Sequence, residues 1–518
     1  MRPNWLVVGM TALAVAGCTT APPPYADVAA PAARFGMFEQ SADIGKTGIA
    51  GGASFDAATG SYRVTGGGAN IWGEEDAFHF LSIPLSGDLH IAADVAWVGK
   101  GADPHRKAGP MIRQNLTPGS PYADVMLHGD GLVALQYREV QNGPTFEIQS
   151  NVKSPRRIRL EREGDYVLFS VAGPDGVLRH AGGNFRIRMP GAYHAGLAVS
   201  AHNNAVAETA NFSNVSIAVP KLAHVPDTGY PAAVESTLEL MDIDGPSRKI
   251  VRHFPTKIEA PNWSRDGRWL IYNAGGAIYR IPAAGGEPTL VNTGPYRKNN
   301  NDHGLSPDGT MLAISDQSAP DDHSRIYVLP VTGSEAPRLV VSHPSAPSYW
   351  HGWSPDGRTL AYTATRPETK DYDIWAKDVA GGPERRLTTA PGLDDGPEYS
   401  PDGRYIYFNS TRSGAMQIWR MRADGTNPEQ VTADASYRDW FPHISPDGKW
   451  IVFVSFGLDV ALGDHPPNRD VVLRIMPADG SAKPRVLTKL FGGQGTINVP
   501  SWSPDSRSIA FVSYRLVR

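Results

Sequence analysis

A short turn motif recurs six times in the second half of the chain, and its regular spacing constrains the fold more than any other feature. The motif is an apolar residue followed by Ser-Pro-Asp-Gly or a close variant, and its copies begin at Trp263, Leu305, Trp353, Tyr399, Ile444 and Trp502. The copies are roughly 42 to 48 residues apart, with a longer last interval, and a repeat of that length is typical of β-propeller blades.

The residue types of the motif predict a tight hairpin turn. Proline presets φ at the second turn position, aspartate can accept a hydrogen bond from the backbone two residues further on, and glycine tolerates a positive φ. Apolar, β-branched or aromatic runs follow the turns, for example 269–272, 278–281 and 338–342. These runs complete four predicted strands per repeat.

The two ends of the repeat region predict how the ring closes. Only one strand-like run, 508–513, follows the sixth turn motif. Upstream of the first motif, 238–245 and 249–252 have the form of the third and fourth strands of a blade. We therefore expect a six-bladed β-propeller over residues 236–518, whose last blade combines strands from both ends and leaves no open sheet edge.

Residues 36–220 have a different pattern, with long alternating strands and no repeat. Residues 89–98 and 157–162 alternate between apolar and polar side chains, and 122–137 have the form of a hairpin. We expect an all-β protein in which this region forms an N-terminal β-sandwich, joined to the propeller by a linker at 221–235.

Four segments of the N-terminal region resemble the concanavalin-type jelly rolls found beside bacterial carbohydrate enzymes. They are 107–113, 128–131, 164–170 and 196–202. The resemblance implies a jelly-roll sandwich that serves either as a sugar-binding module or as a structural spacer.

The N-terminus resembles a bacterial lipoprotein signal. A positively charged start is followed by an apolar stretch at 6–16 and by Val-Ala-Gly before Cys18, so we expect a signal peptide at 1–17 and lipid attachment at Cys18. The alternative is an ordinary secretory signal with an incidental cysteine. Thr19 follows the cysteine, and a residue other than aspartate at this place resembles the sorting signal of outer-membrane lipoproteins. The Ala/Pro-rich stretch at 18–35 predicts a tether.

The composition suits ordinary globular domains. The chain is 41% hydrophobic with a formal net charge of -4, which argues against nucleic acid as a partner. Cys18 is the only cysteine, so internal disulfides are excluded. No stretch after the signal is long and apolar enough for a membrane span, so we expect membrane contact through the lipid anchor only.

Residues just before four consecutive turn motifs form a candidate metal site. His303, His351, Glu398 and His443 occupy equivalent places in the repeats, and these places lie at the mouth of the central channel of a propeller. Three imidazoles and a carboxylate that converge there would suit a divalent ion such as manganese, zinc or calcium. The alternative is that each is a hydrogen-bonded loop residue.

Further residues near these places form a candidate substrate site. The residues expected to stack on sugar rings or to hydrogen-bond to them are Trp350, Trp440, Asp394, Asp395 and Gln494. Aromatic residues also pack between blades, which is the alternative role of the two tryptophans. Arg366 and Arg438 can pair with a carboxylate of the substrate.

The repeat as a whole, with its Trp-Ser-Pro-Asp-Gly, Ile-Trp and Ala-Asp-Gly elements, resembles the TolB-type propeller over about residues 236–518. Similar repeats occur in oligogalacturonate lyases, whose channel holds a histidine-rich manganese site and whose histidine base and arginine perform β-elimination on a uronic acid. The resemblance implies a mouth lined by His303, His351, His443 and Gln494, although the ordered ligand signature of the lyases is not reproduced.

From these observations we expect a lipoprotein of the outer membrane that binds an acidic glycan and processes it. The reaction would be metal-assisted β-elimination or hydrolysis, with His303 as the base and with Arg366 and Arg438 as further catalytic residues. The alternative is a TolB-like scaffold or glycan-binding lipoprotein without catalysis, which contacts other envelope proteins. A peptidase is excluded because the chain has no Gly-x-Ser-x-Gly elbow.

Overall fold

The computed structural model describes residues 35–220 and 233–517, and every regular element in these two ranges is a β-strand. The expected signal peptide at 1–17, the lipid-bearing Cys18, nearly all of the tether and most of the linker at 221–235 lie outside the described residues. In the part that the structure describes, no helix is long and apolar enough to cross a membrane.

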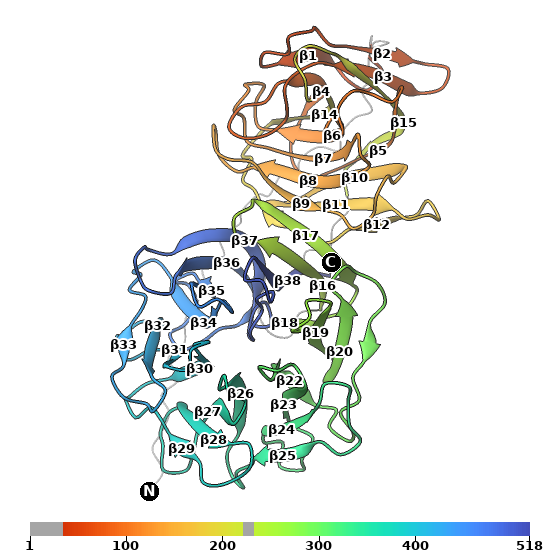
Figure 1. Cartoon of the computed structure of the whole chain (residues 1–518). Helices are drawn as coiled ribbons and strands as arrows, with labels where there is room; N and C mark the ends of the chain where they lie inside the picture. Colours follow the sequence, from red (N-terminus) through yellow and green to blue (C-terminus); the bar gives the residue numbers. More distant parts are fainter. Residues whose placement is uncertain (1–34, 221–232, 518) are drawn as a thin grey trace, which may run out of the picture.

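The first domain contains two sheets (Figure 1). Its first sheet contains, in spatial order, β1 (Gln40–Ile44), β4 (Phe78–Leu85), β14 (Tyr193–Ser200), β6 (Lys107–Arg113), β7 (Tyr122–His128), β8 (Val133–Arg138) and β9 (Phe146–Gln149). Its second sheet contains β12 (Leu178–His180), β11 (Tyr166–Ala172), β10 (Arg157–Glu163), β5 (Leu89–Trp97), β15 (Glu208–Ala218), β3 (Ser61–Gly66) and β2 (Gly52–Asp56), while β13 (Phe185–Arg186) pairs with β11.

The two sheets face each other across one apolar core. Ile91 of β5 and Leu160 of β10 enter this core from the second sheet, and Ile112 of β6, Val125 of β7 and Leu197 of β14 enter it from the first. Alternate residues of each strand point away from the core, which accounts for the alternation in the sequence. The concanavalin-type jelly-roll topology stays a prediction.

The propeller contains five separate four-stranded blades, and in each the strands follow one another in chain order. The first two blades are β18 (Glu259–Trp263), β19 (Trp269–Ala274), β20 (Ala277–Pro282), β21 (Thr289–Leu290), and β22 (Asn299–Leu305), β23 (Met311–Asp316), β24 (Arg325–Pro330), β25 (Arg338–Val341). The next two are β26 (Ser348–Trp353), β27 (Thr359–Ala364), β28 (Asp373–Asp378), β29 (Arg385–Arg386), and β30 (Asp394–Tyr399), β31 (Tyr405–Ser410), β32 (Gln417–Arg422), β33 (Glu429–Gln430). The fifth is β34 (Arg438–Ile444), β35 (Trp450–Phe456), β36 (Pro467–Pro477) and β37 (Arg485–Gly493). In Figure 1 the first strand of each blade lies nearest the centre of the ring and is therefore its inner strand.

The predicted hairpin turns are confirmed, and the motif residues hold them together. In the third copy the Ser354 hydroxyl donates to Asp356 Oδ1 (2.6 Å) and accepts from the backbone N–H of Thr359 (2.9 Å). Asp356 Oδ1 also accepts from the backbone N–H of Arg358 (3.1 Å), and Gly357 has a φ of +69°. The same serine–aspartate bond, 2.5 to 2.7 Å long, is present in the other five copies.

Tryptophans of the motif connect neighbouring blades. The indole N–H of Trp353 donates to the carbonyl oxygen of Gly304 on the preceding blade (3.1 Å), and that of Trp502 donates to the carbonyl oxygen of His443 (2.9 Å). Gly304 also lies directly against another tryptophan, because a Cβ at this position would be 2.1 Å from the ring of Trp350. Only glycine allows the blades to approach this closely.

The expectation of a six-bladed propeller is wrong, because only five blades form four-stranded sheets of their own among the described residues. The strands expected for the sixth blade, β38 (Ser508–Leu516), β16 (Val234–Asp242) and β17 (Ser247–Phe254), continue the first sheet of the first domain, which thereby has ten strands. The residues at the sixth turn motif, which hold the place of the first strand of a blade, contribute only an isolated bridge between Trp502 and Ile509. The predicted pairing of the two ends of the propeller segment is present, since β38 and β16 pair in antiparallel fashion over nine residue pairs.

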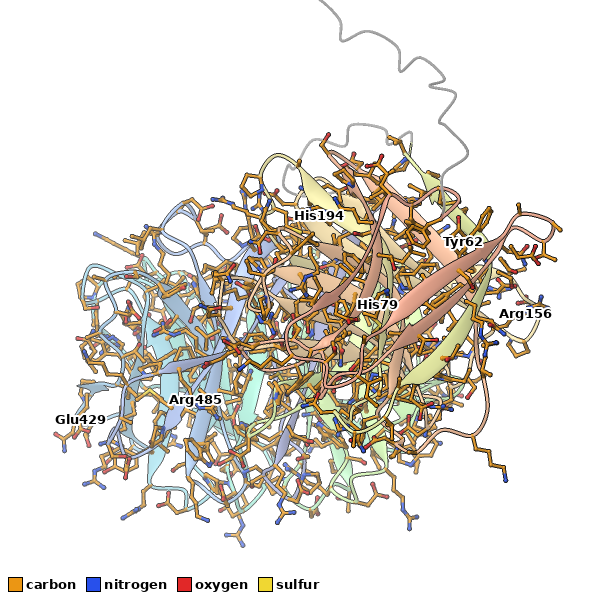
Figure 2. All side chains as sticks on the ribbon, turned by 90° about the horizontal axis from the view of Figure 1, so that it is seen from above. Tyr62, His79, Arg156, His194, Glu429 and Arg485 are labelled. Carbon is orange, nitrogen blue, oxygen red and sulfur yellow. The ribbon has the colours of Figure 1, made fainter. Side chains whose placement is uncertain are left out.

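The junction between the domains is made by the backbone itself. β17 pairs in parallel with β9 through Ser247–Glu147, Arg248–Ile148 and Lys249–Gln149. Figure 1 shows this sheet continuing from the first domain into the ring, and in Figure 2, seen from above, Glu429 lies on the side of the propeller far from the first domain. The first domain is thus joined to the rim of the propeller by a shared sheet.

A buried ion pair lies beside this junction. The Arg248 guanidinium binds both carboxylate oxygens of Glu239 (2.6 and 2.8 Å) and also donates to the carbonyl oxygen of Asn184. The hydroxyl of Ser513 on β38 donates to Glu239 Oε1 (2.5 Å). Both charged side chains are almost fully buried, so each depends on the other for the neutralisation of its charge.

We expect Arg248→Met to reduce the free energy of unfolding by about 3–5 kcal/mol, because it leaves Glu239 buried without its counter-charge. The matched control is Lys249→Met on the same strand, whose ion pair with Asp242 is half exposed and should contribute no more than about 1 kcal/mol. Urea unfolding followed by tryptophan fluorescence measures both variants. An equal loss of unfolding free energy in the two variants would contradict a larger contribution of the buried ion pair to stability.

Candidate functional site

A cavity of about 500 Å³ lies on the axis of the propeller, where the inner strands of all five blades meet. The inner strands contribute Glu259 (β18), Asn300, Asn301 and Asp302 (β22), Tyr349 and His351 (β26), Asp395 (β30) and Phe441 (β34). The remaining lining residues are Thr363, Tyr372, Leu393, Gly463, His465, Gln494 and Asn498. This axial cavity brings polar groups from every blade together.

An irregularity in each inner strand sets which side chains reach the axial cavity. The pairing of each inner strand with its neighbour shifts register at one point: Glu259/Asn262, Asn299/His303, Trp350/Gly352, Asp395/Glu398 and Trp440/His443. Such bulges re-aim side chains and are enriched at functional sites. Three residues near them, Ala260, Gly396 and Phe441, have φ between +55° and +64°, a conformation that costs free energy for the two that are not glycine.

His351, Asp302 and Asp395 form the charged centre of the axial cavity. His351 Nε2 lies 3.2 Å from Asp395 Oδ1. Burial by itself would lower the pKa of His351, but the nearby Asp302 and Asp395 raise it above its usual value. Burial also disfavours ionisation of Asp395, yet the hydrogen bond and charge of His351 lower its pKa to about 2. Asp302, by contrast, has its pKa raised to about 7, mainly by burial.

Apart from Glu259, which pairs with Lys257 (2.6 Å), most of the other lining groups are hydrogen-bonding or aromatic side chains. The Asn300 amide donates to Asp302 Oδ2 (2.8 Å), and the Asn498 amide donates to Gln494 Oε1 (2.9 Å). The rings of Tyr349 and Tyr372 lie 6.2 Å apart. The arrangement offers carboxylates, carboxamides and phenol rings to a ligand within one small volume.

His465 comes from the long connection between β35 and β36. Its ring stacks on Trp440 at a centroid distance of 4.3 Å and contacts Phe441 edge-on at 5.3 Å. Burial lowers its pKa below the usual value, and its buried Nδ1 has no hydrogen-bond partner among the described residues. His465 therefore contributes an imidazole with a lowered pKa to the cavity wall, and its Nδ1 is shielded from solvent.

The structure does not bring the four expected metal ligands together. Among the described residues, no three of His303, His351, Glu398 and His443 have ligand atoms within 4.8 Å of one another. His443 Nδ1 lies 2.7 Å from Glu398 Oε2, and its Nε2 lies 2.7 Å from the carbonyl oxygen of Ile497. Both ring nitrogens of His443 are thus engaged, and a carbonyl can only accept, so Nε2 carries a proton.

The position of each expected ligand in its strand explains this separation. His303 and His351 stand three residues before the serine of their turn motifs, whereas Glu398 and His443 stand two residues before it. Successive residues of a strand point to opposite sides, so the two sets diverge. The bulges differ as well, because His351 falls within the bulge of its strand and lines the axial cavity, whereas His303 pairs with Ile314 and does not. His303 is fully buried with Nε2 facing the carbonyl of Ile271, and burial lowers its pKa to about 4.

Glu398 and Trp350 instead line a second cavity, of about 270 Å³, at the end of the channel formed by the turn motifs. Trp350 is almost fully buried and packs between blades, which is the alternative role noted above. Trp440 is also fully buried and reaches the axial cavity only through its contact with His465.

The expected arginines do not line the axial cavity. Arg366 pairs with Glu384 (2.6 Å) and donates to Ser348, and Arg438 donates to the carbonyl oxygen of Val460. Asp394, expected to bind substrate, pairs with Arg412 (2.7 Å). Of the expected substrate-binding residues, Asp395 and Gln494 do line the axial cavity.

Several lining residues were not assigned a role from the sequence, namely Glu259, Tyr372, His465 and Asn498, whereas Asn300, Asn301 and Asp302 were expected near the mouth as hydrogen-bonding groups. A usable signal was present for the inner strands, because polar residues stand two to four positions before the turn motifs where a blade core would require apolar ones. No such signal existed for His465 and Asn498, which come from connections that differ between blades.

Comparisons with known proteins concern mainly the propeller. The family model described as TolB beta propeller domain matches residues 306–461. The uncharacterized protein Atu1656 of Agrobacterium fabrum is 48% identical over 288 residues, which are 55% of this chain and 95% of the relative. A Tol-Pal system protein TolB of Francisella tularensis is 28% identical over 305 residues, which are 57% of this chain and 66% of that protein.

Solved structures were compared with the chain as well, and one of them is similar in both sequence and fold. A putative TolB from Agrobacterium tumefaciens has a TM-score of 0.51 at 48% identity and covers 55% of this chain and 99% of its own. An oligogalacturonate lyase in complex with manganese has a TM-score of 0.34 at 17% identity, over 51% of this chain and 71% of the lyase, a likeness too distant to carry any argument about function. Because 48% identity extends over 95% of Atu1656, the chain belongs to the family of TolB-type β-propeller proteins.

Proposed function

We propose that this TolB-type propeller protein is a binding protein of the cell envelope, and that its axial cavity holds a glycan built from neutral or amine-bearing sugars. The observation that carries the proposal is the chemistry of the cavity wall. Three carboxyl groups, from Glu259, Asp302 and Asp395, line the cavity, and no arginine or lysine is among its lining residues, although Lys257 pairs with Glu259 (2.6 Å).

This charge balance argues against an acidic glycan. A uronate needs cationic partners, but Arg366 and Arg438 are engaged in contacts outside the axial cavity. His351, whose pKa is raised, is already paired with Asp395. The ionised Asp395 would repel the carboxylate of a uronate. The four side chains that were expected to bind a neutralising metal are divided between two places along the channel. β-elimination on a uronic acid therefore has no support from the geometry.

A neutral or amine-bearing sugar fits the same groups well. Carboxylates and carboxamides form paired hydrogen bonds with neighbouring hydroxyls, and an ammonium group would add a charge-assisted bond to Asp395. Tyr349 and Tyr372 supply the aromatic surfaces on which sugar rings pack. The volume of about 500 Å³ lies in the range of small-ligand sites.

Hydrolysis of such a glycan is a second candidate function. The observation that favours it is the divergence of two carboxylates in one cavity, since the pKa of Asp302 is raised to about 7 and that of Asp395 is lowered to about 2. A protonated carboxyl group and an ionised one are the two groups that glycosidases use as acid and as nucleophile or base. The release of new reducing ends from a bound oligosaccharide would distinguish hydrolysis from binding alone.

The location of the protein is part of the same proposal. The signal-like N-terminus supports export, with lipid attachment at Cys18 and residence at the outer membrane. The similarity to Tol-Pal system proteins supports the cell envelope and contact with other envelope proteins. On this proposal the propeller would present its axial cavity to glycans within or near that envelope.

Isothermal titration of the purified chain with matched oligosaccharides tests the binding proposal. We expect binding of neutral or amine-bearing oligomers and none of uronate oligomers of equal length. Asp395→Asn should weaken binding roughly 10- to 100-fold, the usual effect of removing one charge-assisted hydrogen bond. Glu398→Gln, a carboxylate change at the other end of the channel, is the matched control and should bind as the wild type does.

Preferential binding of uronate oligomers would overturn the proposal. Equal losses in Asp395→Asn and Glu398→Gln would place the ligand elsewhere or indicate a general effect on the ring. Saturable binding that resists both changes would likewise exclude the axial cavity as the site.

The raised pKa of Asp302 predicts an unusual pH dependence of stability. In the unfolded chain this carboxyl ionises near pH 4, but in the folded protein it keeps its proton to about pH 7. The folded state therefore binds more protons between these values, and Asp302 makes the protein less stable as pH rises through that window.

We expect Asp302→Asn to stabilise the protein at pH 8 by up to about 4 kcal/mol and to have little effect near pH 4. The control is Asp308→Asn in a turn motif, where hydrogen bonds from Ser306 and Thr310 lower the pKa of the aspartate, so its loss should destabilise the protein above pH 4. Thermal unfolding at several pH values measures both. A destabilised Asp302→Asn at pH 8 would show that this carboxylate is held by favourable partners.

A further inference from the structure

A histidine and two glutamates meet on the second sheet of the first domain, away from the axial cavity. His90 on β5 pairs directly with Glu161 on β10, and Glu163 stands two residues further along the same strand. The three side chains therefore project from the same face of the sheet, opposite to the face on which Ile91 and Leu160 enter the apolar core.

The distances among these three groups suit a shared cation. His90 Nε2 lies 3.6 Å from Glu161 Oε2 and 3.5 Å from Glu163 Oε1, and all three ligand atoms lie within 4.8 Å of one another. These separations are long for hydrogen bonds. They are close to the roughly 3.4 Å that separates two ligands of a tetrahedral zinc ion when each lies about 2.1 Å from the metal.

The imidazole nitrogen that faces the glutamates is unsatisfied. His90 Nε2 is shielded from solvent and has no hydrogen-bond partner among the described residues, although 20% of the whole side chain is exposed. The two glutamates are 2% and 4% exposed, so water does not compensate for this arrangement. A buried donor or acceptor without a partner costs free energy, and a bound ion between the three groups would remove that cost.

Neighbouring groups hold the two glutamates in place. Arg159 Nε lies 3.1 Å from Glu161 Oε1, and the Ser170 hydroxyl donates to the same oxygen, which leaves Oε2 directed at His90. Arg515 of β38 lies 3.4 Å from Glu163 Oε1 and from Glu235 Oε2. These contacts hold both carboxylates beside His90.

We propose that His90, Glu161 and Glu163 form a binding site for a divalent ion of the zinc class, with the fourth position open to water. One imidazole and two carboxylates are ligands that suit such ions, and the surrounding arginine and serine contacts orient the carboxylates as outer ligands commonly do. Because Arg515 belongs to the last strand of the propeller, the site lies where the two domains meet. Ion binding therefore stabilises the junction as well as the first domain, and it does not depend on the function proposed for the axial cavity.

Titration of the full chain with Zn²⁺ after removal of metal by a chelator tests the proposal. We expect one equivalent to bind with a Kd on the order of 1 μM or tighter, and a hundredfold excess over Kd to raise Tm by about 3 °C. Co²⁺ bound in its place should show the strong visible absorption of a tetrahedral site. His90→Gln and Glu163→Gln should each weaken binding at least tenfold and abolish the absorption band.

Two matched variants separate this site from other histidines. His194→Gln changes a half-buried histidine on β14, labelled in Figure 2, that has no carboxylate partner in the structure, and it should bind Zn²⁺ as the wild type does. His351→Gln removes the histidine of the axial cavity and should also leave binding unchanged. Loss of binding in His351→Gln but not in His90→Gln would overturn the proposal, as would the absence of saturable binding to the folded wild-type chain.

Discussion

The pairing of β16 with β38 is the interaction on which the rest of the propeller depends. Nine residue pairs join a strand from the start of the propeller segment to the last strand of the chain. The five blades are separate sheets that contact one another through side chains and a few bonds such as that of Trp353. Without the closing pair the ring could open, and the inner strands would no longer face a common axis.

The same ring also accommodates local costs at its centre. Every inner strand is irregular, a non-glycine residue such as Phe441 takes up a positive φ, and Asp302 is buried in a state that resists ionisation. None of these features helps folding. Strained backbone and poorly solvated carboxyl groups that gather at one place are typical of sites selected for binding or catalysis. The stability lost at such a site is compensated by the rest of the fold.

Regular features of the fold could be predicted from the sequence, and irregular ones could not. The motif residues specify the turn through bonds between neighbours such as Ser354 and Asp356, so the blades and the closing strand were predictable. The bulges have no comparable local signature, and they decide that Asp302 rather than His303 reaches the axial cavity. The pairing of β17 with β9 also escaped prediction, because only three residue pairs, about a hundred positions apart, form it.

The shared ten-stranded sheet has a consequence for access to the ring. Because β9 and β17 are joined by backbone hydrogen bonds, the first domain cannot swing about this junction as a hinged cover would. It lies beyond the rim and not over the channel (Figure 1). Entry along the propeller axis is therefore sterically unobstructed by the first domain, and a long polymer could thread one of its ends inward while the remainder stayed in solvent.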